Sequence, residues 1–370
     1  MNTNQRIEVV DLLRGLSCLG VLLYHVRVDL WIGWWRITSY PQEYSAFAKA
    51  MAWLSIPTPF LGYAILLFFL ISGFCIHFPN TEYNKAAPSW KTYFIRRFWR
   101  IYPTYLVAVI ITSIISYYCH VNWGDPTWDT QKILRVATVS QNYPPNNGQF
   151  LSNPSLWTIP LEIEFYALYP LAFFFFTKFK SILLLLTVSL GISGLCVYLA
   201  SSSMQWLSFT AFFLWPSWLL GTWVASLHRF GKIHSINLTV LIAGSVISLI
   251  ISLLSRLNNW DSWLQYAFWT AFYFFLFILF LKCDGFFHRA RNFFLIRGLA
   301  WIGKISFSLY LIHFPLFKLF GYLHQETFEE KPANFLTSLL YILPVILFAW
   351  LFFKCVEDPI HQWSKKKRKR

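Results

Sequence analysis

The residues of this chain that could do chemistry are ionisable side chains set within long apolar segments. Arg14 and His25 lie eleven residues apart in the first such segment. On a helix they would face the same way to within about 20° and lie about 16 Å apart along the axis. The imidazole could act as a general base and the guanidinium could bind a phosphate. The structural alternatives are a snorkelling arginine and a packing histidine.

A second group of ionisable residues falls in the segment 154–176. Glu162 lies about 12 Å below the predicted outer end of this helix, and His25 lies about 9 Å below the outer end of its own helix. Glu162 and Glu164 are two residues apart and cannot share a face, so at most one is expected beside His25. A carboxylate there would orient the imidazole. Alternatively, both glutamates pair with arginine and only hold helices together.

A third group lies in the segment 298–320. Ser306, Tyr310 and His313 follow i, i+4, i+7 spacing and share one helix face. His313 lies about 22 Å above the predicted inner end of the helix, which is level with His25. Tyr310 or Ser306 could donate a hydrogen bond to a developing oxyanion. The alternative is a structural polar seam between helices.

Basic residues gather at the predicted inner ends of these segments. Arg96, Arg97 and Arg100 fall within five residues, just before the third apolar segment. With Arg14 and Lys304 they could cradle a phosphate, because guanidinium binds phosphate in a bidentate way. A simpler interpretation of these arginines is that they belong to the positive charge that membrane proteins commonly carry on their inner side.

The composition indicates what kind of scaffold positions these groups. The chain has 370 residues, of which 56% are hydrophobic, 21% aromatic and only 13% charged, with a net charge of +15. A soluble domain has about 45–50% apolar and about 25% charged residues. These values exclude an ordinary soluble enzyme, a disordered chain and a nucleic-acid binder. The six cysteines include no close-spaced pair, which argues against a disulfide framework and a metal site.

Hydropathy predicts an all-α, polytopic membrane protein with about ten transmembrane helices, since a span needs about 20 apolar residues. The predicted spans are 9–31, 57–79, 98–119, 154–176, 181–200, 206–228, 236–255, 262–282, 298–320 and 334–355. We expect residues 1–360 to form the membrane domain and 361–370 a basic cytosolic tail. The connection 120–153, rich in Pro, Asn and Gly, is predicted to be a surface loop.

The placement of lysine and arginine predicts the orientation of the chain. With the N-terminus inside, 21 of the 31 Lys and Arg residues fall on inner segments and seven on outer segments. This bias predicts that both termini are cytosolic. The first segment is too long for a signal peptide and is interpreted as a retained span.

Six segments, taken in order, resemble the motifs of the membrane-bound acyltransferase family 3, the OafA-like O-acyltransferases of surface polysaccharides. They are IEVVDLLRGLSCLGVLLYH, FFLISGFCI, FIRRFWRIYPTYL, PSLWTIPLEIEFYALYPL, IGKISFSLYLIHFPL and VEDPIHQW. Two positions depart from the family pattern. Tyr24 precedes His25 where many members have paired histidines, and Glu164 stands where Gln is common. No SGNH-type hydrolase segment accompanies these motifs, so the resemblance is to the minimal membrane form.

The resemblance implies an enzyme that takes an acyl group, usually acetyl, from cytosolic acyl-CoA. The acceptor would be a hydroxyl of an extracytoplasmic polysaccharide or lipopolysaccharide O-antigen sugar, free or lipid-linked, at the bacterial inner membrane. Acetyl-CoA would be a substrate, and no cofactor would be bound permanently. His25 would act as general base or carry the acyl group, with Glu162 orienting it, Glu164 in reserve for that role, and His313 at the same level.

In this reading Arg14, Arg96, Arg97, Arg100 and Lys304 would hold the CoA phosphates. Ten spans with buried charges are also typical of a transporter of a glycan or lipid precursor. The sequence shows no paired Gly/Pro-broken helices and no clear repeat, which disfavours a transporter. A third hypothesis is that the protein is a membrane scaffold in which the buried charges have only a structural role.

Overall fold

The computed structural model describes residues 8–81, 88–145, 150, 152–179 and 181–367, and every regular element in those ranges is a helix. Ten segments are long and apolar enough to cross a membrane. They are Glu8–Leu30, Ala46–Asn80, Trp90–Trp123, Pro154–Phe179, Ile182–Ser202, Gln205–Arg229, Leu238–Leu257, Ser262–Lys282, Phe294–Phe328 and Phe335–Lys366. The prediction of an all-α protein with ten spans is therefore confirmed, with most boundaries within a few residues.

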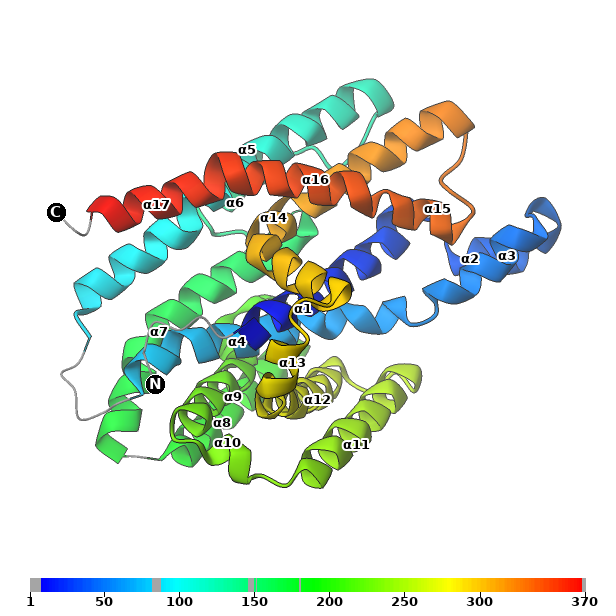
Figure 1. The fold of residues 1–370 in the computed structure, drawn as a ribbon. Coiled ribbons are helices and arrows are strands. Elements are labelled where there is room, and N and C mark those ends of the chain that lie inside the picture. Colours follow the sequence, from blue (N-terminus) through cyan, green and yellow to red (C-terminus); the bar gives the residue numbers. More distant parts are fainter. Residues whose placement is uncertain (1–7, 82–87, 146–149, 151, 180, 368–370) are drawn as a thin grey trace.

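The helices form one bundle with α1 in its middle (Figure 1). The long helices are α1 (Glu8–His25), α4 (Ile65–His77), α5 (Trp90–Trp123), α7 (Thr158–Phe179), α8 (Ile182–Ser202), α9 (Ala211–Arg229), α11 (Leu238–Leu257), α12 (Ser262–Lys282), α14 (Phe294–Phe328), α16 (Ile342–Phe352) and α17 (Asp358–Lys367). Short helices connect them: α2 (Trp34–Ser39), α3 (Ala46–Ala52), α6 (Thr130–Ala137), α10 (Lys232–Ser235), α13 (Asp284–Arg289) and α15 (Phe335–Leu340).

Close packing of α1 against α14 fixes the centre of the bundle. A Cβ added at Gly15 would overlap the carbonyl oxygen of Leu299, and one added at Gly303 would overlap that of Asp11. Lipid tails give no hydrophobic drive for helices to associate, so small residues that allow close backbone contact take that role. This contact sets the register between the polar residues of α1 and those of α14.

Two prolines inside spans leave backbone carbonyls free, and side chains from other parts of the chain satisfy them. Pro315 has no N–H to bond the carbonyl of Leu311, and Asn153 Nδ2 donates to that oxygen at 2.9 Å. Pro170 likewise frees the carbonyl of Tyr166, which accepts from Tyr93 Oη at 3.3 Å. An unsatisfied carbonyl would be costly within a membrane, so these bonds tie α14 and α7 to their neighbours.

The connection 120–153 is not simply a surface loop, which corrects the prediction. Helix α5 continues to Trp123 and α6 follows. Gln141 and Asn142 are buried, and Asn142 Nδ2 donates to the carbonyls of Trp157 and Phe209 at 2.7 Å each. The polar residues that suggested exposure instead satisfy backbone groups at helix ends.

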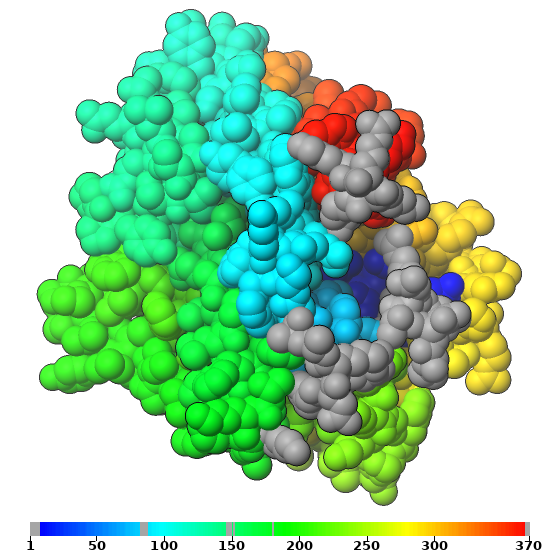
Figure 2. All heavy atoms as spheres, turned by 90° about the vertical axis from the view of Figure 1, so that its left-hand side faces the viewer, coloured from blue at the N-terminus to red at the C-terminus, as the bar shows by residue number. Residues whose placement is uncertain are grey.

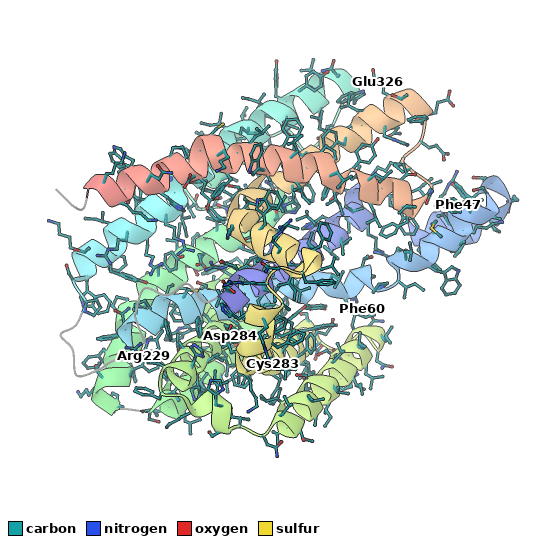
Figure 3. The ribbon with its side chains drawn as sticks, viewed as in Figure 1. Phe47, Phe60, Arg229, Cys283, Asp284 and Glu326 are labelled. Atoms are coloured by element: carbon teal, nitrogen blue, oxygen red, sulfur yellow. The ribbon has the colours of Figure 1, made fainter. Side chains whose placement is uncertain are left out.

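Labelled residues from predicted inner and outer segments lie at opposite ends of the bundle. Arg229 lies at the left end, whereas Phe47 and Glu326 lie at the right end (Figure 3). The orientation prediction requires inner and outer segments to lie at opposite ends, and these residues fit that requirement. Which end faces the cytosol stays a prediction. The predicted domain boundary after residue 360 falls inside α17.

Candidate active site

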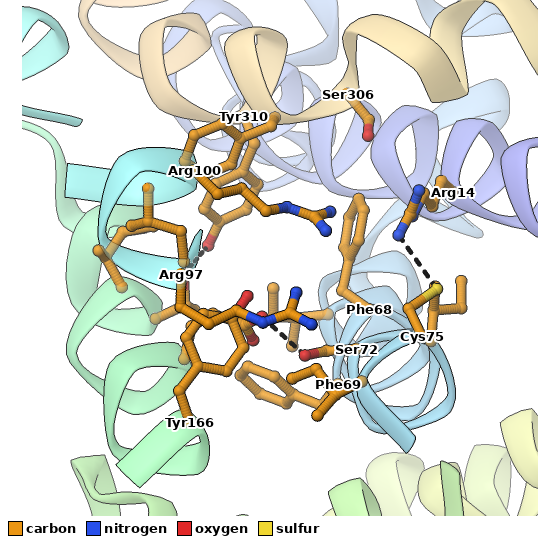
Figure 4. Close-up of a pocket in the computed structure, with 18 of the residues that line it drawn as sticks. Arg14, Phe68, Phe69, Ser72, Cys75, Arg97, Arg100, Tyr166, Ser306 and Tyr310 are labelled. Carbon is orange, nitrogen blue, oxygen red and sulfur yellow. Dashed lines mark hydrogen bonds between the residues drawn. The ribbon is translucent and has the colours of Figure 1, made fainter. Parts of the chain in front are cut away.

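A cavity with charged and apolar lining residues lies within the bundle, formed mainly by α1, α4, α5, α7 and α14. It has about 950 Å³ of empty space, counting the part open to solvent. Its lining includes four cationic side chains and two carboxylates: Arg14, Arg97, Arg100, Lys304, Glu162 and Glu357. Figure 4 shows the guanidinium groups of Arg14, Arg97 and Arg100 converging on this space from α1 and α5. Four cations against two carboxylates make the cavity suited to an anionic ligand.

Aromatic rings rather than carboxylates hold Arg97 in place. Its guanidinium carbon lies 5.3 Å from the ring centre of Tyr93 and 5.2 Å from that of Tyr166. These are cation–π distances, and the buried Nε atom has no hydrogen-bond partner. Arg14 contacts Cys75 Sγ through Nη2 at 3.3 Å, and its Nη1 lies 3.8 Å from Asp11. Both guanidinium groups therefore keep donors for a ligand.

Two of the three predicted arginines of α5 reach the cavity. Arg97 and Arg100 line it, whereas Arg96 does not. Helical rotation does not account for this difference, because Arg96 points about 100° from Arg97 but only about 40° from Arg100. The lining of the cavity therefore does not match the expectation that Arg96 joins the phosphate cradle. Lys304 lines the cavity from α14, as predicted.

The two predicted histidines meet directly. His313 Nε2 lies 2.9 Å from His25 Nδ1, and the ring centres are 5.0 Å apart. His313 is fully buried, whereas His25 is partly exposed. The prediction that both histidines lie at one depth is confirmed by this contact.

The hydrogen bonds around the histidine pair define where its protons lie. His313 Nδ1 contacts only carbonyl oxygens, those of Tyr310 at 2.8 Å and Leu309 at 3.2 Å. Nδ1 must therefore carry a proton, and Nε2 of neutral His313 accepts from His25 Nδ1. This assignment leaves Nε2 of His25 with its lone pair, the form that a general base requires.

Tyr310 separates the histidine pair from the cavity. It lines the cavity, and its ring centre lies 5.8 Å from that of His313. Its hydroxyl donates to the carbonyl of Ser155 at 2.7 Å and accepts from Thr158 at 2.8 Å. Ser306 also lines the cavity, and its hydroxyl donates to the carbonyl of Gly303 at 3.0 Å. An oxyanion role for either hydroxyl would require these bonds to break.

The glutamates of α7 take positions that differ from those expected. Glu162 lines the cavity and accepts from Ser72 Oγ at 2.6 Å. It makes no hydrogen bond to His25 in the structure, so the expected orienting contact is wrong, and His313 occupies that place. The depth of a residue along its own helix does not specify which neighbouring helix it faces.

Glu164 points to another side of α7, as its spacing from Glu162 predicted. It accepts from Tyr143 Oη at 2.5 Å and from the backbone N–H of Ala211 at 2.6 Å. Burial, followed by the bond to this carboxylate, raises the pKa of Tyr143. Glu164 therefore ties the segment before α7 to the start of α9 and makes no contact with the histidine pair.

Two polar residues of the cavity, Glu357 and Ser72, are among those that the sequence did not indicate. Glu357 is buried, lines the cavity and accepts from Ser308. It lies in the VEDPIHQW motif, just past the predicted end of the last span, where a lone carboxylate gave no positional signal. Ser72 lies in the FFLISGFCI motif, and nothing else in the sequence indicated that it lines the cavity.

The fold and this site define a multi-pass membrane protein whose cation-lined cavity approaches a pair of hydrogen-bonded histidines. The chain belongs to the acyltransferase family whose model is described as "Acyltransferase domain" (family 3), which matches residues 7–354. The resemblance drawn from its motifs is thereby confirmed.

A peptidoglycan O-acetyltransferase, OatA of Listeria monocytogenes, is similar to this chain. The two are 22% identical over 387 residues, covering 96% of this chain and 56% of the relative. The chain thus spans little more than half the length of that protein. No solved structure matches the chain.

Proposed function

We propose that this protein is a membrane O-acyltransferase that moves an acetyl group from cytosolic acetyl-CoA to a hydroxyl of an extracytoplasmic glycan. The observation that carries the proposal is the His25–His313 pair, with its free imidazole nitrogen, beside a cavity rich in cations. The family assignment and the similarity to an O-acetyltransferase support the reaction class.

The cavity suits the donor, because CoA carries phosphates at one end and a thioester at the other. Arg14, Arg97, Arg100 and Lys304 would pair with phosphate oxygens through charge-assisted hydrogen bonds. The thioester would then reach toward the histidines past the ring of Tyr310.

His25 would act as general base in the transfer step. Its Nε2 removes the proton of the acceptor hydroxyl while the oxygen forms a bond to the thioester carbonyl carbon. The C–S bond then breaks, and the departing thiolate takes the proton from the imidazolium. The products are the acetyl ester and the CoA thiol.

His313 would hold His25 in the reactive tautomer and stabilise the imidazolium. It accepts the Nδ1 proton of His25, and two backbone carbonyls fix its own orientation. This role for a second group behind a catalytic histidine follows the logic of a catalytic triad. Glu162 would act at the donor end, where its carboxylate lies among the arginines.

The acceptor would be a cell-surface glycan such as a polysaccharide or a lipopolysaccharide O-antigen, free or lipid-linked. The relative is named for O-acetylation of peptidoglycan, which is also a surface glycan. We place the protein in the bacterial inner membrane with both termini cytosolic, since the arginine end of the bundle would then meet cytosolic acyl-CoA.

Radiolabelled acetyl-CoA supplied to proteoliposomes, with surface glycan on the opposite side, tests the proposal. Covalent label on the glycan with wild-type protein, and none with His25→Ala, is expected. The exposed His234 provides a matched control, and His234→Ala should retain transfer. Counterflow of an intact substrate without covalent label would instead identify a transporter.

A further inference from the structure

A second cavity lies beside the first at the same end of the bundle. It is formed by the start of α1, by α13 and by the first turns of α14, with about 1440 Å³ of empty space including its open side. Lys304 lines both cavities, so they are adjacent. Figure 2 shows a recess in this face between the cyan start of α5 and the yellow segment of α13 and α14, with dark-blue α1 at depth.

The second cavity has cations that the protein does not neutralise. Arg291, Arg297 and Lys304 line it. Within the described residues, no ion pair is present for the guanidinium group of Arg291 or Arg297. Unpaired arginines in a concave site are a typical arrangement for binding phosphate.

The two carboxylates that line this cavity already have partners. Glu8 lies 3.3 Å from His288 Nδ1, and Asp11 lies 3.8 Å from Arg14. Neither carboxylate forms an ion pair with Arg291 or Arg297, and three cations against two carboxylates leave the lining with a net positive charge.

Aromatic side chains lie among these cations. Arg297, Trp301 and Lys304 have i, i+4, i+7 spacing and share one face of α14. Phe294 lines the cavity one turn earlier, and Trp301 is 41% exposed, so its ring is open to contact. Aromatic rings stack on nucleobases, while arginines hold the phosphates.

The spacing along α14 sets the shape of a ligand that could use both cavities. Arg297 and His313 are sixteen residues apart on one continuous helix, which is about 24 Å. Such a ligand must be extended, with an anionic aromatic group at one end and the reacting group at the other.

We infer that the second cavity binds the adenine nucleotide of the acyl donor, with the base against Trp301 and the phosphates at Arg291, Arg297 and Lys304. The inference rests on the proposed use of acyl-CoA. The first cavity then receives the phosphopantetheine arm, and Lys304 contacts the donor where the two cavities meet.

Binding of two donors separates the nucleotide site from the rest of the proposal. Acetyl-CoA carries the nucleotide, and acetyl-phosphopantetheine lacks it. With wild-type protein in nanodiscs of neutral phosphatidylcholine, acetyl-CoA should bind about tenfold or more tightly than the truncated donor. Arg297→Gln and Trp301→Leu should each reduce this advantage without changing the dissociation constant of acetyl-phosphopantetheine.

Arg289→Gln is the matched control. Arg289 lies nearby on α13, does not line the cavity, and donates from Nε to the carbonyl of Gly285 at 3.2 Å. This variant should bind both donors as the wild type does. Trp301→Leu provides an independent variant if Arg297→Gln does not accumulate.

Each other outcome is informative. Equal binding of the two donors by the wild type would overturn the nucleotide site and leave the proposed function standing. Weaker binding of both donors by Arg297→Gln would also overturn it, because the arginine would then contact the shared part of the donor. If Arg297→Gln and Trp301→Leu changed binding only in nanodiscs that contain anionic lipid, the second cavity would be assigned to a lipid headgroup and the nucleotide site would be overturned. Binding of neither donor by the wild type would refute the proposed use of acyl-CoA.

Discussion

Replacing His313 with leucine tests the histidine pair, because it removes the acceptor of the His25 Nδ1 proton and keeps a side chain of similar size. The wild-type contact between His313 Nε2 and His25 Nδ1 is 2.9 Å long, and His313 is fully buried. With leucine at position 313, His25 would lose the side chain that fixes its tautomer and stabilises its imidazolium.

The size of the effect follows from the bond that is lost. A hydrogen bond to a charged group is worth about 1.5–3 kcal/mol. At about 1.36 kcal/mol per tenfold change in rate, His313→Leu should lower kcat about 10- to 150-fold. Removing the base itself in His25→Ala should cost more, about 10²- to 10⁴-fold.

The assay is transfer of labelled acetyl from acetyl-CoA to glycan in proteoliposomes, at equal amounts of folded protein. The kcat of His313→Gln should lie between those of the wild type and His313→Leu. The glutamine amide oxygen can accept from His25 Nδ1 while its amide nitrogen donates to the backbone carbonyl of Tyr310. His25→Ala combined with His313→Leu should be no slower than His25→Ala alone. Wild-type kcat in His313→Leu, or additive losses in the double variant, would refute the relay.

Three further predictions concern the donor site and the scaffold. Arg97→Gln should raise KM for acetyl-CoA about tenfold or more, whereas Arg96→Gln should not change it, and equal effects would contradict the assignment of the cavity lining. Gly303→Ala should reduce thermal stability and yield, since its Cβ overlaps a carbonyl of α1 at a cost of about 1–3 kcal/mol, whereas Gly298→Ala, with open space around it, should not. Burial opposes ionisation of Asp125, but Lys318 at 2.8 Å and Thr127 lower its pKa, so its carboxylate stabilises the fold above about pH 3.9 and this contribution is lost as the pH falls through the lowered pKa. Asp125→Asn should therefore lower Tm less at pH 3 than at pH 7, and an equal loss at both values would show that charge is not the cause.

The sequence predicted those features that depend on one helix at a time. Ten apolar runs gave the ten spans, since length and hydropathy are local properties. The shared face of Ser306, Tyr310 and His313 and the opposite directions of Glu162 and Glu164 followed from helical spacing. The common depth of His25 and His313 followed from the rise per residue.

Features that depend on contacts between helices were not predictable in this way. Glu162 was expected beside His25 because their depths matched, yet packing of α1 against α14 through Gly15 and Gly303 brings His313 there instead. Glu357 joins the cavity because a π-helical segment, Phe353–Glu357, continues the last span past its predicted end.

The hydrogen-bond partners of polar residues in the connecting segments could not be predicted from the sequence either. Asn142 looks like a loop residue in the sequence but bonds two carbonyls at helix ends. Asn153 satisfies the carbonyl that Pro315 frees, a pairing across 158 positions between Asn153 and Leu311. Such pairs are specified only once the helices have packed.

The most direct test of the central claim is mass spectrometry of the surface polysaccharide from cells with wild-type protein, with His25→Ala and with no protein. The account predicts a mass increase of one acetyl group per repeat with wild-type protein alone. The same modified glycan with His25→Ala, at normal protein levels, would contradict the assignment of His25 as the base.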